Sequence, residues 1–277
     1  MLRVHLFGRF RASGEAGPLT ALERRKVHEL LGYLLLSWQR PARREVLAEQ
    51  LWATSDPLRC RKYLRQSLWR LRCVLDAAGC RDVLQADQEW IGLRPDASLW
   101  ADTLELERAY ARCAAAASRE LAPDLVAAAE RAVDLCQAPL LDGWYTDWSL
   151  LAREQYRAMH LALLDRLMAA AERAGRWEAG LAYGRRALRE DPAGERVHVR
   201  LMRLHLLSGD RSAALRQFGL CGAALERELG VAPAPETRRL FELIRDGRMV
   251  AAAGPLSAAG PGPERALVQL AGAGNGR

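Results

Sequence analysis

The residues best suited to a chemical role lie in one basic stretch, 57–75, with the sequence PLRCRKYLRQSLWRLRCVL. It contains five Arg, one Lys and no acidic residue. On a helix of about 100° per residue, Leu64, Leu68, Leu71 and Leu75 form one narrow apolar stripe. The opposite face is centred on Arg59, Lys62, Gln66, Trp69 and Cys73, with Arg65, Arg70 and Tyr63 at its edges. The stretch therefore predicts a helix with one side that packs and one side that meets anions.

These side chains are the types that bind nucleic acid. Arg can donate two hydrogen bonds to guanine, Gln can pair with adenine, and any basic side chain can neutralise a phosphate. Trp69 on a polar face indicates contact with a sugar, a thymine methyl group or a partner protein. A charged helix face is most often merely solvated, but these arginines lack the glutamates four residues away that ordinarily neutralise such a face.

The basic excess of the chain lies almost entirely in its first third. Residues 1–100 hold 17 basic and 11 acidic residues, whereas residues 101–277 hold 24 and 23. A local basic excess favours a polyanionic partner, although a solvated basic surface without a partner would have the same composition.

The elements that must position this helix begin with a strand. Apolar residues alternate with polar ones from Leu2, and Gly14, Gly17 and Pro18 indicate a small hairpin region. Thr20–Glu23 has the spacing of a capping box, which predicts a helix that begins there and ends near Arg40–Pro41.

Two more helices and a hairpin follow. Pro41 is expected to open a second, shorter helix, and Asp56–Pro57 to cap a third that runs to about Ala78. Residues 83–93, VLQADQEWIGL, predict two short strands around residues 87–89. Strands, three helices and a terminal hairpin are the element order of a winged helix-turn-helix, so residues 1–100 are expected to be an α+β DNA-binding domain.

Residues 101–248 are expected to form an all-α domain of tetratricopeptide-like helical repeats. Aligning Gly175 with Gly209 also superposes Ala179 on Ala213, at a spacing of 34 residues, which is the tetratricopeptide period. A generic helical bundle with a coincidental repeat is the alternative. Residues 249–277, rich in Ala, Gly and Pro, predict a disordered tail. The predicted helices span residues 102–117, 123–136, 147–174, 177–190, 194–208, 211–229 and 235–246.

Other chemistry finds little support in the sequence. The six cysteines form no C-x-x-C pair and no histidine lies at metal-ligand spacing, so we expect reduced, mostly buried thiols, no metal and no cofactor. No phosphate-binding loop or nucleophile elbow occurs, so the chain is not expected to be an enzyme. The absence of a long apolar run predicts a cytoplasmic, nucleoid-associated protein rather than a membrane protein or a secreted one.

Three segments resemble one known family. RREVLAEQLW, LRQSLWRLRCVL and, most specifically, ERELGVAPAPETRRL at 226–240 are similar to SARP-type bacterial activators. These proteins join a response-regulator-like winged helix to a bacterial transcriptional activator domain, and the resemblance covers about residues 1–246. It implies sequence-specific binding to double-stranded DNA, often as dimers on direct promoter repeats, and activation through contact with RNA polymerase.

The resemblance also implies which residues contact DNA. The exposed face of the family's recognition helix corresponds here to Arg59, Lys62, Arg65, Gln66, Trp69 and Arg70, and Arg72 lies in the closing Leu-Arg pair of that helix. The segment Leu84–Leu93 corresponds to the wing, but Asp87 and Glu89 stand where such wings often have Gly and basic residues. Acidic groups at the wing tip should repel phosphate. Either the wing inserts little into DNA, or Trp90 packs internally and Gln88 makes the only wing contact.

Two functions remain open for the chain. The first is a transcriptional activator that binds DNA through residues 59–72. The second is a protein-interaction adaptor whose winged helix has lost its affinity for DNA, which the acidic wing favours and the acid-free third helix opposes. The aromatic residues at 144–148 either line a ligand or peptide groove on the repeats or pack between helices, and packing is the preferred interpretation.

Overall fold

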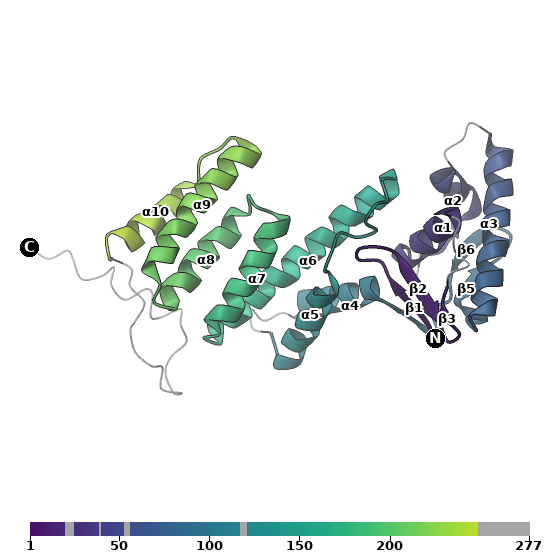
Figure 1. Cartoon of the computed structure of the whole chain (residues 1–277), viewed down its shortest axis with the longest axis horizontal. Coiled ribbons are helices and arrows are strands. Elements are labelled where there is room, and N and C mark those ends of the chain that lie inside the picture. Colours follow the sequence, from purple (N-terminus) through teal and green to yellow (C-terminus); the bar gives the residue numbers. More distant parts are fainter. Residues whose placement is uncertain (20–24, 39, 53–55, 117–120, 249–277) are drawn as a thin grey trace, which may run out of the picture. The chain divides into compact units, whose positions relative to one another are not determined.

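The computed structural model describes residues 1–19, 25–38, 40–52, 56–116 and 121–248 (Figure 1). The chain folds as two compact units that are interleaved along the sequence. The first comprises Met1–Ala109 and Arg131–Met159, and the second comprises Tyr110–Glu130 and the residues from His160 onward. A boundary at residue 100 was expected from the sequence, whereas residues 131–159 return to the first unit. The expected tail, 249–277, lies outside the described residues.

A small sheet opens the first unit. Its strands are β1 (Leu2–His5), β2 (Arg11–Gly14), β3 (Gly17–Pro18) and β7 (Leu99–Ala101), in the spatial order β3-β2-β1-β7. The predicted strand at Leu2 and the hairpin at Gly14–Pro18 are confirmed, since β2 and β3 pair antiparallel. Strand β7 was not expected from the sequence. It pairs parallel with β1 and places the end of the wing region beside the N-terminus.

Three helices and a second sheet complete the winged helix. The helices are α1 (Arg25–Leu36), α2 (Arg44–Leu51) and α3 (Pro57–Ala77). Leu30, Leu31, Leu34 and Leu35 of α1 are buried, as their spacing predicts. The capping box at residues 20–23 lies outside the described residues. The strands β4 (Ala42–Arg43), β6 (Trp90–Leu93) and β5 (Leu84–Ala86) form the second sheet, with a short helix η2 (Arg81–Val83) before it.

The prediction that Pro41 opens the second helix is wrong. Pro41 precedes β4, and α2 begins only at Arg44. The β4–β6 pairing holds this segment extended, and a Cβ atom added at Gly92 would lie 3.2 Å from Pro41. Strand pairing with a segment about fifty positions away therefore overrides the local preference for a helix start at proline.

The aromatic residues at 144–148 pack inside the first unit, in agreement with the preferred interpretation. The Trp148 ring meets the Tyr33 ring at a centroid distance of 5.4 Å, and Trp144 stacks on Phe10 at 5.7 Å. Tyr145 is the exception, because 74% of it is exposed. Residues after position 130 thus complete the core of the winged helix.

A buried carboxylate closes the sheet of the first unit onto α4 (Asp102–Ala115). The side chain of Asp102 accepts hydrogen bonds from the backbone N–H groups of Leu6, at 2.9 Å, Phe7, at 3.0 Å, and Thr103, at 2.8 Å. Burial raises the pKa of Asp102, while these backbone donors and nearby His5 act to lower it. The carboxylate thus satisfies three backbone donors at the end of β1 and the start of α4.

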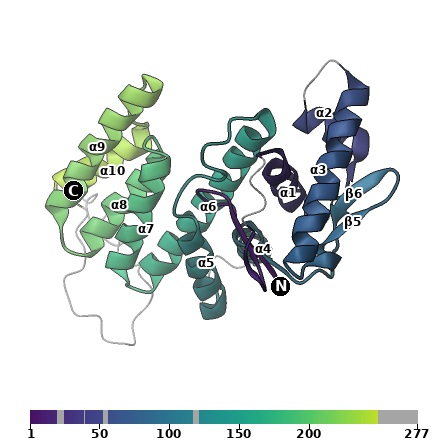
Figure 2. The ribbon, with the colours of Figure 1, turned by 45° about the vertical axis from the view of Figure 1, so that its right-hand side comes forward.

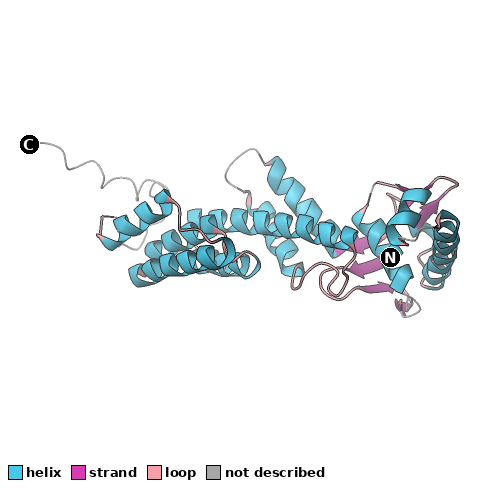
Figure 3. Cartoon of the chain, turned by 90° about the horizontal axis from the view of Figure 1, so that it is seen from above, coloured by secondary structure: helices cyan, strands magenta, loops and turns pink. Residues whose placement is uncertain are grey.

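The remaining helices begin and end close to the predicted positions. They are α5 (Pro123–Leu135), α6 (Asp147–Arg173), α7 (Trp177–Glu190), α8 (Glu195–Leu207), α9 (Arg211–Leu229) and α10 (Pro235–Arg245). Among the described residues, strands belong only to the first unit, as the magenta segments of Figure 3 show.

Two helix ends in the second unit, 34 residues apart, have the same backbone geometry. Gly175 and Gly209 both have positive φ, at 68° and 87°. Each donates from its N–H to the carbonyl three residues earlier, and the next N–H in each case donates to the carbonyl five residues earlier. The α6–α7 and α8–α9 turns therefore have the same hydrogen-bonding pattern, which requires a residue in the left-handed region that glycine adopts without strain.

A buried histidine joins α8 to α9 in the second unit. His198 Nε2 lies 2.9 Å from the carbonyl oxygen of Pro192, to which its proton is donated, and Nδ1 accepts from Gln217 Nε2 at 2.6 Å. This arrangement requires the neutral ring. Burial lowers the pKa of His198, against the opposing influence of Glu195 and Asp191.

We expect the free energy of unfolding to fall as the pH is lowered below about 6.5, the ordinary pKa of histidine. Because the pKa of His198 is lower in the folded state, the unfolded chain binds more protons there, so this stability is present above pH 6.5 and lost below it. Urea unfolding followed by circular dichroism at about pH 7.5 and about pH 5.5, on either side of that value, measures the difference. His198→Gln should reduce it, and an equal pH dependence in that variant would contradict the assignment.

Candidate nucleic-acid interface

The basic stretch forms a single well-capped helix, α3. The side chain of Asp56 accepts from the backbone N–H groups of Leu58, at 3.0 Å, and Arg59, at 3.4 Å, and Pro57 occupies the first turn. The expected cap at Asp56–Pro57 is confirmed, because both features satisfy or remove donors that the first turn leaves free. The packing side of α3 is the one predicted. Its buried residues are Leu64, Leu68, Leu71 and Leu75, together with Cys60 and Ser67.

The other side of α3 carries the predicted DNA-contacting residues. Arg59, Lys62, Arg65, Gln66, Trp69 and Arg72 are exposed, and Arg70 is half-buried. Trp69 is 66% exposed, which is unusual for so large an apolar side chain. Seven of the eight candidate residues therefore lie on one helix. The eighth, Gln88, is exposed in the turn of the β5–β6 hairpin, which lies beside α3 in Figures 1 and 2.

Most of the positive charge on this face is not neutralised by the protein. Within the described residues, no carboxylate lies within ion-pair distance of Lys62, Arg65, Arg70 or Arg72. Arg59 differs, because its Nε lies 3.3 Å from Oδ2 of Asp56, the capping residue. Both partners are largely exposed, so the pair contributes little and can open toward a phosphate. The four unpaired cations are the stronger candidates for contacts with DNA.

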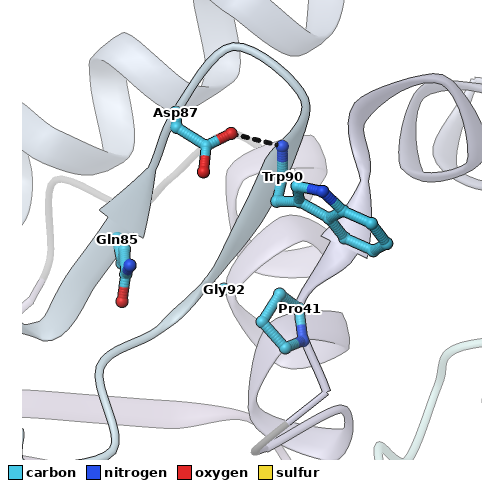
Figure 4. Close-up of a pocket in the computed structure, with 5 residues that line it drawn as sticks. All are labelled: Pro41, Gln85, Asp87, Trp90 and Gly92. Carbon is cyan, nitrogen blue, oxygen red and sulfur yellow. Dashed lines mark hydrogen bonds between the residues drawn. The ribbon is translucent and has the colours of Figure 1, made fainter.

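The acidic residue at the wing tip has a structural role that its charge alone does not indicate. Asp87 Oδ1 accepts from the backbone N–H groups of Glu89, at 2.8 Å, and Trp90, at 2.7 Å, and so closes the β5–β6 turn. Figure 4 shows the bond to Trp90 at the edge of a shallow pocket that Pro41, Gln85 and Gly92 also line. These donors lower the pKa of Asp87, which stays ionised at neutral pH.

Arg43 at the end of β4 and Arg44 at the start of α2 contact the wing, and neither was predicted from the sequence. Arg44 Nη1 donates to the carbonyl oxygen of Asp87 at 2.7 Å, and the guanidinium of Arg43 lies 5.2 Å from the ring of Trp90. Trp90 is therefore partly packed against Arg43, although 39% of it remains exposed. The adjacent basic residues Arg43 and Arg44 were visible in the sequence. They were not considered as wing contacts, because a helix was expected to begin at Pro41.

The amide variant Asp87→Asn is expected to raise the affinity for DNA by about threefold at low salt, because it removes a negative charge near phosphate and keeps the acceptor that closes the turn. The gain should fade at high salt through screening. Asp87→Ala, which also removes the acceptor, provides the matched comparison. Equal affinities for the Asn variant and the wild type at every salt concentration would show that the wing tip stays away from phosphate.

The described part of the chain contains no group of three or more His, Cys, Asp or Glu residues placed to hold a metal ion. Nor does it contain a helix with the length and apolarity needed to span a membrane. Five of the cysteines are buried thiols, and Cys73 is exposed on α3, at the position the helical wheel indicates.

Comparisons with known proteins identify the family. Residues 101–245 match the model of the bacterial transcriptional activator domain. No curated protein matches the sequence. Among solved structures, the chain is similar to Mycobacterium tuberculosis EmbR, solved in complex with a low-affinity phosphopeptide, with a TM-score of 0.62 and 24% sequence identity.

The alignment covers 92% of this chain and 66% of EmbR, so the chain spans slightly less than two thirds of that protein. At this identity the likeness concerns the fold, and it confirms the expected mixed α/β region followed by a helical domain. The family match covers more than half of the chain and confirms the resemblance to SARP-type activators. The chain is a member of the bacterial transcriptional activator domain family.

Proposed function

We propose that this chain is a sequence-specific regulator that binds double-stranded DNA with the exposed face of α3 and activates transcription. In this proposal residues 1–100 bind DNA, and residues 101–248 contact RNA polymerase or a second subunit on promoter repeats. The site of action is the nucleoid. The observation that carries the proposal is the set of four exposed or half-buried cations on α3 without carboxylate partners among the described residues, at the third-helix position of a winged helix.

The face has the groups needed for both kinds of contact. Arg65 and Arg70, at its edges, can reach phosphates or guanine edges, Gln66 can pair with adenine, and Trp69 offers an apolar surface to a thymine methyl group or a sugar. Gln88 extends the proposed contact to the wing. Because the face is preformed and well capped, binding does not require α3 to fold first.

The test is fluorescence anisotropy of the full chain with DNA upstream of its own gene and with random genomic fragments, across a salt series. The full chain is needed because residues 131–159 belong to the first unit. A regulator should show steep salt dependence, since each neutralised phosphate contributes a slope of about −0.9 in log K against log salt. It should also retain a preference for its own upstream DNA at physiological salt.

Absence of binding even at low salt would favour the adaptor instead. The acidic wing was the sequence feature in favour of that function. Asp87 now has another explanation, because its carboxylate closes the wing turn through two backbone hydrogen bonds. The activator is therefore the proposal that the observations support better.

A further inference from the structure

A pocket in the second unit combines apolar walls with a net positive charge, as a site for a small organic anion would. It is lined by α5, by the end of α6 and by the turn before α7, and its volume is about 400 Å³. Leu121, Pro123, Val126, Ala127, Ala170 and Ala174 supply mostly apolar walls, and Glu130, Arg173 and Arg176 supply the charged groups. Pockets of this size accommodate small ligands rather than protein segments.

Arg173 is the charged residue of this pocket whose guanidinium lacks an acceptor in the described part of the chain. Its Nε atom is buried, and neither that atom nor the rest of the guanidinium has a hydrogen-bond or ion-pair partner among the described residues. Guanidinium groups that are partly withdrawn from water are normally paired, because an unsatisfied buried donor costs free energy. A ligand carrying acceptor oxygens would remove that cost.

The other two charged residues at the pocket already neutralise each other. Arg176 Nη2 lies 3.4 Å from Oε1 of Glu130, and the same oxygen accepts from the hydroxyl of Tyr183 at 2.7 Å. This leaves Arg173 as the unbalanced charge, so the charged lining residues sum to +1 and favour a singly charged anion.

In another pocket of the same unit, the charged lining residues have partners within the protein. It is lined by Tyr110, Asp165, Arg166 and Arg196 among others. There Asp165 pairs with Arg196 at 3.0 Å, and Arg166 donates to the carbonyl oxygens of Cys113 and Ala116. Each of these charged groups has a partner, so that pocket carries no comparable indication of a ligand.

We propose that the α5–α6 pocket binds a small monocarboxylate with an apolar body, such as a medium-chain fatty acid. The carboxylate pairs with the guanidinium of Arg173, for which two parallel N–H donors are the preferred geometry. The aliphatic chain lies against Leu121, Val126 and Ala127. Such a ligand would give the activator domain a small-molecule input, but its binding does not depend on the proposed DNA contacts.

Isothermal titration of the full chain with sodium octanoate tests this site. We expect saturable binding at one site, weakened about tenfold or more in Arg173→Met, which removes one charge-assisted pair. Arg173→Lys, which keeps the charge, should weaken it less. Ala127→Phe, which fills the pocket and leaves Arg173 in place, should abolish binding. Arg203→Met, on an exposed part of α8 outside the pocket, is the matched control and should bind as the wild type does.

Three ligands separate the two parts of the proposed site. Octanamide, which lacks the charge, and acetate, which lacks the chain, should each bind at least about tenfold more weakly than octanoate, because each lacks one of two contributions. Acetate or inorganic phosphate binding as tightly as octanoate would overturn the apolar part of the proposal. Octanoate binding that is unchanged in both Arg173→Met and Ala127→Phe, with wild-type circular dichroism spectra, would overturn the site.

Discussion

The double variant Arg65→Ala/Arg70→Ala should bind the chain's own upstream DNA at least about thirtyfold more weakly at physiological salt. Each arginine that touches a base or a phosphate contributes about 1–3 kcal/mol, so two contribute about 2–6 kcal/mol. Neither arginine has a carboxylate partner among the described residues, so the substitutions affect DNA binding rather than an internal ion pair. Anisotropy titrations across a salt series measure the effect.

The salt dependence of these titrations also separates the two kinds of interaction. A single variant whose arginine neutralises a phosphate should show a slope smaller by about 0.9 and bind all sequences more weakly to the same extent. A variant whose arginine recognises a base should instead show a smaller preference for the upstream DNA. Arg→Lys at the same positions should restore the phosphate contribution but not bidentate base recognition, because lysine lacks the planar fork of donors.

A matched control removes the same charge elsewhere. Arg203→Ala/Arg216→Ala lowers the net charge equally, on exposed positions of α8 and α9 in the second unit. It should leave specific binding within about twofold of the wild type, since screening at physiological salt suppresses distant charges. Equal weakening by both double variants would mean that overall charge, and not the face of α3, determines affinity.

The largest expected decrease in stability follows from Asp102→Ala, which should lower the free energy of unfolding of the first unit by about 3 kcal/mol. The substitution leaves the N–H groups of Leu6 and Thr103 buried, and that of Phe7 partly buried, without an acceptor, and a buried group without a partner costs about 1–3 kcal/mol before the structure relaxes. Tryptophan fluorescence during urea unfolding reports on this unit, because seven of the eight tryptophans belong to it.

Asp102→Asn gives the intermediate case. It keeps the shape and one acceptor oxygen but cannot serve all three donors, so its stability should lie between those of the wild type and the alanine variant. Thr103, the next residue, is also buried, and its hydroxyl does not take part in the hydrogen bonds between Asp102 and β1, so Thr103→Val provides a control without a comparable decrease. Equal stabilities of Asp102→Ala and the wild type would show that these hydrogen bonds do not hold β1 to α4.

Most of the helices could be predicted from the sequence, whereas two of the short strands, β4 and β7, could not. Helices α5 to α10 begin and end within one or two residues of the predicted positions, because amphipathic spacing, capping residues and prolines are local signals. The strands β4 and β7 contain two and three residues, too few for a periodic pattern, and they form only because β6 and β1 pair with them. Long-range pairing of this kind leaves no trace in a local window of sequence.

The candidate site also has a part that local sequence predicts and a part that depends on long-range contacts. The exposed face of α3 follows from helical geometry alone, and the structure places its residues as the helical wheel does. The role of Arg44 at the wing could not be inferred, because its hydrogen bond to the backbone carbonyl oxygen of Asp87 links residues 43 positions apart. Likewise, nothing near Asp102 in the sequence indicates that it accepts hydrogen bonds from residues about 95 positions earlier.

The return of residues 131–159 to the first unit has a consequence for synthesis on the ribosome. The fifty residues from Tyr110 to Met159 must be translated after the winged helix itself, which takes about 2.5–10 s at about 5–20 residues per second. Helices and hairpins form within microseconds, so during these seconds Phe10 and Tyr33 lack the tryptophans that later cover them. The nascent winged helix is therefore an open, apolar target for chaperones and proteases until translation is well into the activator domain.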